Sequence, residues 1–156
     1  MKTVSVNEIK KDLEKRDFKE LIEYCLRLAK FKKENKELLA FLLFDSDNIS
    51  TYIENLKQET NEQFMLINKS NVYFIKKSVR KILRNINKHI RFSLSKPVEA
   101  ELLIHFCNCL SNYSIPIKKS RQLINLYESQ LKKIEKILND LHPDLEYDLR
   151  RQIAKE

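Results

Sequence analysis

Residues 72–92 read VYFIKKSVRKILRNINKHIRF, and this stretch carries the strongest periodic signal in the chain. Its aliphatic residues recur at steps of three and four positions, at Val72, Ile75, Val79, Ile82, Ile86 and Ile90. Because an α-helix has 3.6 residues per turn, this spacing places all six side chains on one face. The stretch therefore predicts an amphipathic helix with one buried face.

Weaker versions of this periodicity predict further helices on both sides. Ser5 with Glu8, and Asp17 with Glu20, have the spacing of capping boxes that begin a helix. The expected helices cover about 6–16, 18–33, 36–44, 49–67, 72–92, 97–110, 117–138 and 143–153. The segment 36–44 is apolar nearly all round, which predicts a central position, whereas the sparse apolar residues of 49–67 predict a mostly exposed helix.

The composition supports a helical chain, because its 156 residues include no glycine. Average usage is about 7%, so roughly eleven glycines would be typical of this length. We therefore predict an all-α fold of seven to eight helices, a compact stack of antiparallel helix pairs that forms a HEAT-like superhelix or a bundle. Neither a linker nor a fixed repeat period is visible, so residues 1–156 are expected to form a single helical domain.

The absence of glycine also argues against several classes of enzyme. Phosphate-binding loops, dinucleotide fingerprints and Gly-x-Ser-x-Gly elbows all depend on glycine backbone, and the chain has none of them. No set of nucleophile, base and orienting group can be assembled from the sequence. The chain is accordingly expected not to be an enzyme and to need no cofactor.

Cysteine and histidine offer the best candidates for a metal site. His105 and Cys109 are four residues apart and share a helix face, whereas Cys107 points elsewhere. Three local ligands cannot converge, so packing in or beside the core is the favoured interpretation and no metal is expected. His142 with Asp144 and Asp148 is explained in the same way, by a helix start.

Localisation follows from the thiols and from the apolar runs. The three cysteines, including Cys25, lie in apolar helical patterns and are expected to be free and buried, as in a reducing cytoplasm. The charged start MKTVSVNEIKKDLEKR does not resemble a signal peptide. The longest apolar run, Leu38–Phe44, has seven residues, too few for the ~20 of a membrane span. The sequence therefore predicts a cytoplasmic protein without a membrane span.

Charge is distributed unevenly along the chain. Between Gln63 and Val98 there are nine Lys and Arg and no acidic residue, while the rest of the chain holds 21 basic and 22 acidic side chains. The basic residues of the predicted helix 72–92 are the candidate site: Lys76, Lys77, Arg80, Lys81, Arg84, Lys88 and Arg91. Cations at steps of three and four along a helix repel one another unless something offsets the repulsion.

Three interpretations of this basic stripe remain open. In one, the backbone of RNA or DNA lies along it, and Tyr73 and Phe92 near its ends stack on bases. In the second, acidic residues of the preceding helix, Glu54, Glu59 and Glu62, fold back and neutralise it. In the third, an acidic protein or an anionic surface covers it. A second basic patch at Lys118, Lys119 and Arg121 would strengthen the first interpretation if it lay beside the stripe.

The function predicted from these features is a non-catalytic binding module that contacts a polyanion through the basic helix. The alternative is a protein–protein interaction or scaffolding module without nucleic acid, for which a homodimer is possible. Its contact would be an exposed apolar patch, either in 36–44 or at Phe64, Met65 and Ile67.

Three stretches of the chain carry a family resemblance: LIEYCLRLAKFKKENKELLAFLLF (21–44), VYFIKKSVRKILRNINKHIRFS (72–93) and KKIEKILNDLHPDLEYDLR (132–150). Together they resemble a family of uncharacterised small all-helical bacterial proteins. The resemblance implies a bacterial cytoplasmic protein over nearly the whole chain. It implies no catalytic or binding residues.

Overall fold

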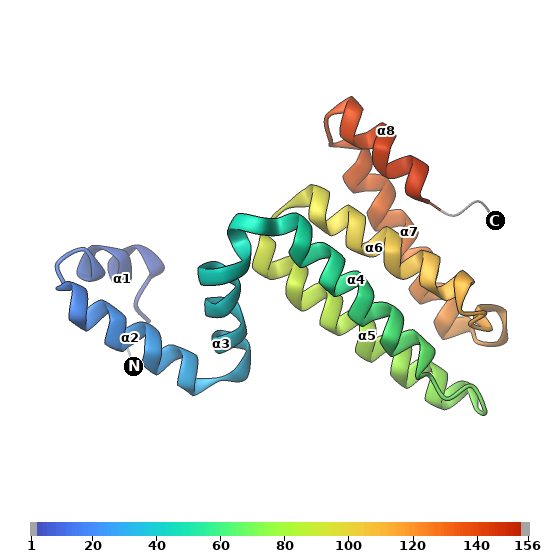
Figure 1. Ribbon diagram of the computed structural model, residues 1–156, viewed down its shortest axis with the longest axis horizontal. Helices are drawn as coiled ribbons and strands as arrows, with labels where there is room; N and C mark the ends of the chain where they lie inside the picture. The colour runs from blue at the N-terminus through green and yellow to red at the C-terminus, as the bar shows by residue number, and fades with distance from the viewer. Residues whose placement is uncertain (1–2, 154–156) are drawn as a thin grey trace. The chain divides into compact units, whose positions relative to one another are not determined.

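The computed structural model describes residues 3–153, and its regular structure is entirely helical (Figure 1). Its α-helices are α1 (Val6–Leu13), α2 (Phe18–Phe31), α3 (Lys33–Ala40), α4 (Ile49–Met65), α5 (Val72–Ser93), α6 (Lys96–Asn112), α7 (Arg121–Asn139) and α8 (Pro143–Gln152). A π-helical turn (Phe41–Asp45) and two 3₁₀ turns (Ser46–Asn48 and Ile117–Lys119) complete the regular secondary structure of the described residues. The predicted all-α fold with seven to eight helices is confirmed.

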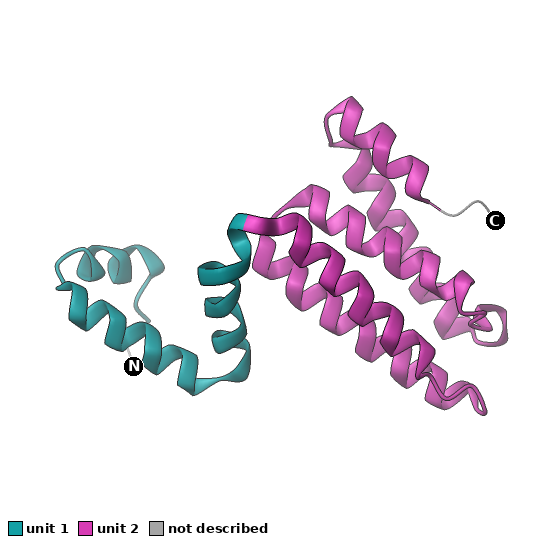
Figure 2. Cartoon of the chain, viewed as in Figure 1, with its two compact units in different colours: residues 1–47 teal, residues 48–156 magenta. Residues whose placement is uncertain are grey.

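The chain divides into two compact units (Figure 2), residues 1–47 and 48–156. We call their described parts the N-terminal unit (3–47) and the C-terminal unit (48–153). The expected single domain over residues 1–156 stays a prediction, since a compact unit is not by itself an independently folding domain. Within the described range, no helix is long and apolar enough to cross a lipid bilayer.

Helix α6 is the centre of the C-terminal unit. It packs against α4, α5, α7 and α8 (Figure 1), and its residues from Pro97 to Leu110 are all buried or half-buried. Its buried residues are Val98, Glu99, Ala100, Leu102, Leu103, Ile104, Phe106, Cys107, Cys109 and Leu110. A helix that is apolar over most of its circumference is stable only when several neighbours cover it, which explains its position.

Helix α5 follows the sequence prediction closely. Asn71 caps its start by accepting the Tyr73 amide, and its buried residues are Ile75, Val79, Ile82, Leu83, Ile86 and Ile90. It ends at Leu94, whose φ of 50° lies in the left-handed region that favours glycine. Ser114, after α6, has a φ of 52°. Without glycine, the chain thus turns at these two points with residues that carry a β-carbon.

Two expectations about helix positions are wrong. The segment 36–44 was expected to be central, but Leu43 and Phe44 are 62% and 78% exposed, and Phe41 is the one buried side chain within residues 3–47. Helix α4 was expected to be mostly exposed, yet it buries Ile53, Leu56, Thr60 and Phe64. Thr60 completes this stripe because its hydroxyl donates to the Leu56 carbonyl at 2.7 Å. A pattern restricted to apolar residues misses such a position.

Candidate nucleic-acid interface

The cations of α5 lie away from the face that α5 packs into the core. Lys77, Arg80, Lys81, Arg84 and Arg91 are exposed, and Lys76 and Lys88 are half-buried. The helical period explains this separation, because the aliphatic residues at 75, 79, 82, 86 and 90 occupy the opposite face. The seven predicted site residues therefore share one helix, and five of them are fully open to solvent.

The acidic residues of α4 bond to residues other than the cations of the stripe. Glu54 pairs with Lys57 at 3.0 Å on its own helix. Glu59 accepts hydrogen bonds from Gln63 at 2.7 Å and from Asn85, an uncharged residue of α5, at 3.2 Å. Glu62 accepts one from Gln58 at 3.5 Å. None of these three carboxylates forms an ion pair with the stripe in the described part of the chain.

Most of the stripe has no carboxylate partner. Among residues 3–153, no carboxylate oxygen lies within 4 Å of a side-chain nitrogen of Lys76, Lys77, Arg80, Lys81, Arg84 or Arg91. Lys76 and Arg80 instead donate to the neutral Gln122 amide oxygen of α7, each at 3.2 Å. The positive charge of these six residues is therefore not neutralised by ion pairs.

A groove runs along this side of α5. It has a volume of about 710 Å³, and its lining includes Tyr73, Lys76, Lys77, Arg80 and Arg84 of α5 together with Gln122. Gln122 lies in the first turn of α7, so the two hydrogen bonds that it accepts hold the start of α7 beside α5. The groove thus combines a row of cations with one aromatic ring and two amides, those of Asn87 and Gln122.

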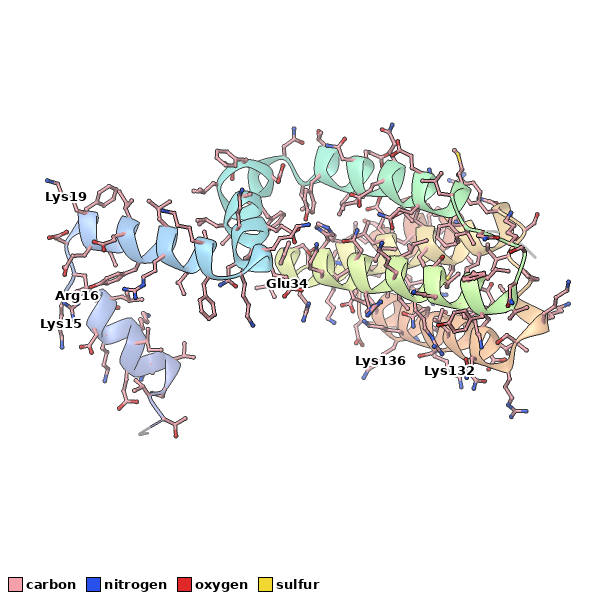
Figure 3. All side chains as sticks on the ribbon, turned by 90° about the horizontal axis from the view of Figure 1, so that it is seen from below. Lys15, Arg16, Lys19, Glu34, Lys132 and Lys136 are labelled. Carbon is pink, nitrogen blue, oxygen red and sulfur yellow. The ribbon has the colours of Figure 1, made fainter. Side chains whose placement is uncertain are left out.

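Helix α7 adds cations that the sequence prediction did not include. Lys132 and Lys136 are exposed, and Figure 3 shows both projecting from α7 in the view that has α5 in front. Glu135 lies between them in sequence, but it binds the Arg150 guanidinium of α8 through two hydrogen bonds of 2.8 and 2.9 Å. Those bonds lower the pKa of Glu135 and pair its carboxylate with a cation of α8. In the sequence, this acid made the charge pattern of α7 look mixed.

Lys133 of α7 has a structural role. Its Nζ lies 2.7 Å from Glu99, which is 7% exposed at the start of α6, and Lys96 contacts the same carboxylate at 2.8 Å. Burial alone would raise the pKa of Glu99, but the hydrogen bonds and charges of Lys133 and Lys96 outweigh it and lower the pKa. The Lys133–Glu99 ion pair therefore holds α7 against α6, while Lys132 and Lys136 remain exposed.

The two aromatic candidates differ. Tyr73 is 60% exposed, lines the groove and touches Phe74 edge-on at 5.7 Å between ring centroids. Phe92 is half-buried and packs edge-on against His89 at 5.5 Å. Only Tyr73 of this pair is thus placed to stack on a bound base.

The second basic patch divides between two places. Arg121 begins α7 and precedes Gln122, which accepts hydrogen bonds from Lys76 and Arg80 of the stripe. Lys118 and Lys119 lie in a separate 3₁₀ turn and line a different hollow of about 410 Å³ together with Cys107. The seventh helix was expected to begin at residue 117, but Ile117–Lys119 form a 3₁₀ turn and α7 begins only at Arg121.

The cysteine–histidine pattern is explained by packing. His105 Nε2 lies 3.0 Å from Asn61 Oδ1 and 3.5 Å from Cys109 Sγ, which confirms that His105 and Cys109 share a face. Burial lowers the pKa of His105 and raises the pKa of the Cys107 and Cys109 thiols to about 12, so both thiols stay protonated and are poor nucleophiles at neutral pH. Cys25 was expected to be buried and is exposed instead.

The other ligand-bearing residues do not form a metal centre in the part of the chain that is described. No group of three or more His, Cys, Asp and Glu residues within 3–153 could hold a metal ion. His142 accepts the Asp144 amide at 3.3 Å and caps α8, which confirms its interpretation as a helix start.

Comparison with known proteins leaves the basic stripe as the main guide to function. No protein-family model, curated protein or solved structure matches the chain. The resemblance to uncharacterised helical bacterial proteins accordingly stays a prediction.

Proposed function

We propose that the C-terminal unit is a non-catalytic module that binds the phosphate backbone of RNA or DNA along α5, without reading its sequence. The observation that supports this module most is that Lys76, Lys77, Arg80 and Arg84 line an open groove and have no carboxylate partner among residues 3–153. Its contact residues are the predicted ones, Lys76, Lys77, Arg80, Lys81, Arg84, Lys88 and Arg91, with Arg121, Lys132 and Lys136 extending the positive surface.

The charge balance gives a physical reason for a polyanionic ligand. Residues 48–156 contain 19 Lys and Arg against 12 Asp and Glu, whereas residues 1–47 contain 11 against 10. Like charges at four-residue spacing destabilise a helix by ~0.2–0.5 kcal/mol per pair. Bound phosphates offset this repulsion and release their condensed counterions, which is the main source of affinity in binding without sequence preference.

The dimensions of the stripe suit several phosphates. From Lys77 to Arg91 the helix rises roughly 20 Å at 1.5 Å per residue. Lys77, Lys81 and Arg84 are exposed and lie within about two turns of the helix. Tyr73 borders the same groove and offers a ring face for one base, a contact that tolerates any sequence.

The test compares two triple variants with the same change in net charge. Lys77→Glu/Lys81→Glu/Arg84→Glu reverses the centre of the stripe, and Lys11→Glu/Lys19→Glu/Lys36→Glu reverses three exposed lysines of the N-terminal unit. Affinity is measured by fluorescence anisotropy with labelled RNA and DNA of about 20 nucleotides. We expect the stripe variant to bind at least about 100-fold more weakly and the control to change by less than about fivefold.

Salt dependence provides the second readout. If three to five phosphates are contacted, the logarithm of the binding constant falls by roughly 2–4.5 for each tenfold increase in salt. Unchanged helicity in circular dichroism shows that the variants are folded. Equal losses in both variants, salt-independent binding, or no binding at low salt would each refute the proposal.

The alternative function is a protein–protein interaction module without nucleic acid. The exposed apolar residues of the N-terminal unit favour it. The same titration identifies a module that binds an acidic protein through the stripe, because that module binds neither the RNA nor the DNA oligonucleotide. In either case we propose a bacterial, cytoplasmic protein, in line with its free thiols and its sequence resemblance.

A further inference from the structure

The N-terminal unit leaves most of its apolar side chains open. Two thirds of the exposed large apolar side chains of residues 3–153 belong to residues 3–47, which make up less than a third of that range. Val6, Phe18, Phe31 and Phe44 are each 77–82% exposed. Helices α1, α2 and α3, all within the described range, bury no residue. Large exposed apolar patches are rare on soluble monomers and mark contact sites.

Part of this surface forms an apolar groove between α2 and α3. The groove has a volume of about 240 Å³ and is lined by Cys25, Leu28 and Ala29 of α2 and by Leu38, Leu39 and Leu42. Asn35 fixes its geometry by donating from Nδ2 to the Leu28 carbonyl at 2.9 Å. The groove is therefore held in shape while its apolar walls remain uncovered.

We infer that a second copy of this chain covers the surface, so that two N-terminal units pack face to face in a homodimer. Charge favours a second copy over a charged partner, because residues 1–47 carry 11 basic and 10 acidic side chains and are nearly neutral. Two C-terminal units, each with seven excess positive charges, repel each other. Nearly neutral apolar faces are self-complementary, as a two-fold interface requires.

The available area also fits a dimer. Fourteen large apolar side chains of the N-terminal unit are exposed. At this degree of exposure they offer on the order of 1,000 Å² of surface, against ~800 Å² per partner in a standard interface. Segments below about 40 residues usually need oligomerisation or another added constraint to form a stable core, and the N-terminal unit is only slightly longer than that.

The first experiment measures the mass of the full-length protein by light scattering between about 1 and 100 µM. We expect twice the chain mass of 18.7 kDa at the upper concentrations. Leu28→Glu/Leu42→Glu, at two exposed positions in the groove, should raise the dissociation constant of the dimer at least about 100-fold. The matched control, Leu66→Glu/Leu94→Glu, changes two leucines of the C-terminal unit that are 84% and 90% exposed and should leave the dimer intact.

The second experiment needs no variant and remains decisive if the groove variant fails to fold. Cys25 lines the groove and is exposed in the single chain, whereas Cys107 and Cys109 are 5% and 1% exposed. In a dimer, Cys25 should react with a thiol reagent at least about tenfold more slowly at 100 µM than at 1 µM protein. A monomer at every concentration, a Cys25 rate independent of concentration, or an undiminished dimer in the folded groove variant would overturn the inference. Oligonucleotide binding is measured separately, so its failure leaves the dimer test unaffected.

Discussion

The two units of this protein are built from the same kind of helix and differ in what those helices bury. Both contain amphipathic helices with hydrogen-bonded caps, such as Ser5 with Glu8 on α1 and Asn71 on α5. The C-terminal unit encloses one connected core that extends from Ile53 to Leu149. Within residues 3–47, only Phe41 is buried. Local signals thus specify a helix without specifying that its apolar face will be covered in the same chain.

The two units also differ in how their basic residues are paired. In the N-terminal unit, several basic residues pair with acids three or four positions away, as in Lys15 with Asp12 and Arg16 with Glu20; Figure 3 labels Lys15 and Arg16 there. In the C-terminal unit, the α5 cations Lys77, Lys81 and Arg84 have no carboxylate partner within the described residues. One unit thus presents a neutral apolar surface and the other a positive surface, and the two proposals assign them different ligands.

The largest expected effect separates core from surface phenylalanines. Phe106 is 0% exposed and packs against Phe64 at 5.7 Å between ring centroids, whereas Phe44 is 78% exposed. Phe106→Ala should lower the free energy of unfolding by about 3–5 kcal/mol, because it leaves a cavity in the core. Phe44→Ala should change it by less than about 0.5 kcal/mol when the protein is dilute. Denaturant titration measures both, and equal losses would show that the N-terminal unit has a core of its own.

A smaller effect is expected at the buried carboxylate. Glu99→Gln should cost about 1.5–3 kcal/mol at neutral pH, because two charge-assisted hydrogen bonds to Lys133 and Lys96 are weakened. The pKa of Glu99 in the folded protein lies below its ordinary value of 4.5. Its contribution is therefore fully present above pH 4.5 and lost as the pH falls through the folded pKa.

The measurement for Glu99 is the difference in unfolding free energy between wild type and variant across this pH range. The difference should shrink as the solution is acidified below pH 4.5. Lys10→Gln, which removes an exposed ion pair with Glu14 in the N-terminal unit, serves as the control and should remain within error of wild type. A Glu99→Gln difference that does not change with pH would contradict the assigned charge pairing.

The smallest expected effect is a gain in stability at the end of α5. Leu94 is 90% exposed with a φ of 50°, a conformation that costs a residue with a β-carbon roughly 1–2 kcal/mol. Leu94→Gly should therefore stabilise the C-terminal unit by about 1 kcal/mol in denaturant titration. Leu66→Gly is the control, because Leu66 is similarly exposed at a φ of −84° and gains nothing from glycine. A loss of stability at position 94 would mean that the Leu94 side chain contributes a contact of its own.

Much of the fold could be predicted from the sequence because helix formation is local. The capping boxes at Ser5 and Asp17 and the buried face of α5 appear where their residue spacing placed them. The exposure of the apolar segment 36–44 could not be predicted, because such a segment looks the same whether its own chain or another molecule covers it. The burial of α4 was underestimated because its apolar residues Ile53, Leu56 and Phe64 are few, and Thr60 adds to the same face by satisfying its hydroxyl within the helix.

The candidate site shows the same division. Its seven basic residues on one helix were visible as a run without acids. The groove, the Gln122 bridge and the cations of α7 were not visible, because they depend on which elements meet. Glu135 illustrates the difficulty: next to Lys132 and Lys136 in sequence it suggests neutralisation, while in the structure Arg150 binds it.

By itself, the sequence determined that this protein is helical, where most of its helices begin and end, and which helix carries the excess charge. Those properties follow from backbone chemistry and from residues three or four positions apart. Tertiary structure alone decided that α6 is central, that the acids of α4 form their bonds away from the stripe, and that the N-terminal unit keeps its apolar face open. Burial and charge pairing depend on residues distant in sequence, and no local pattern specifies which of them come together.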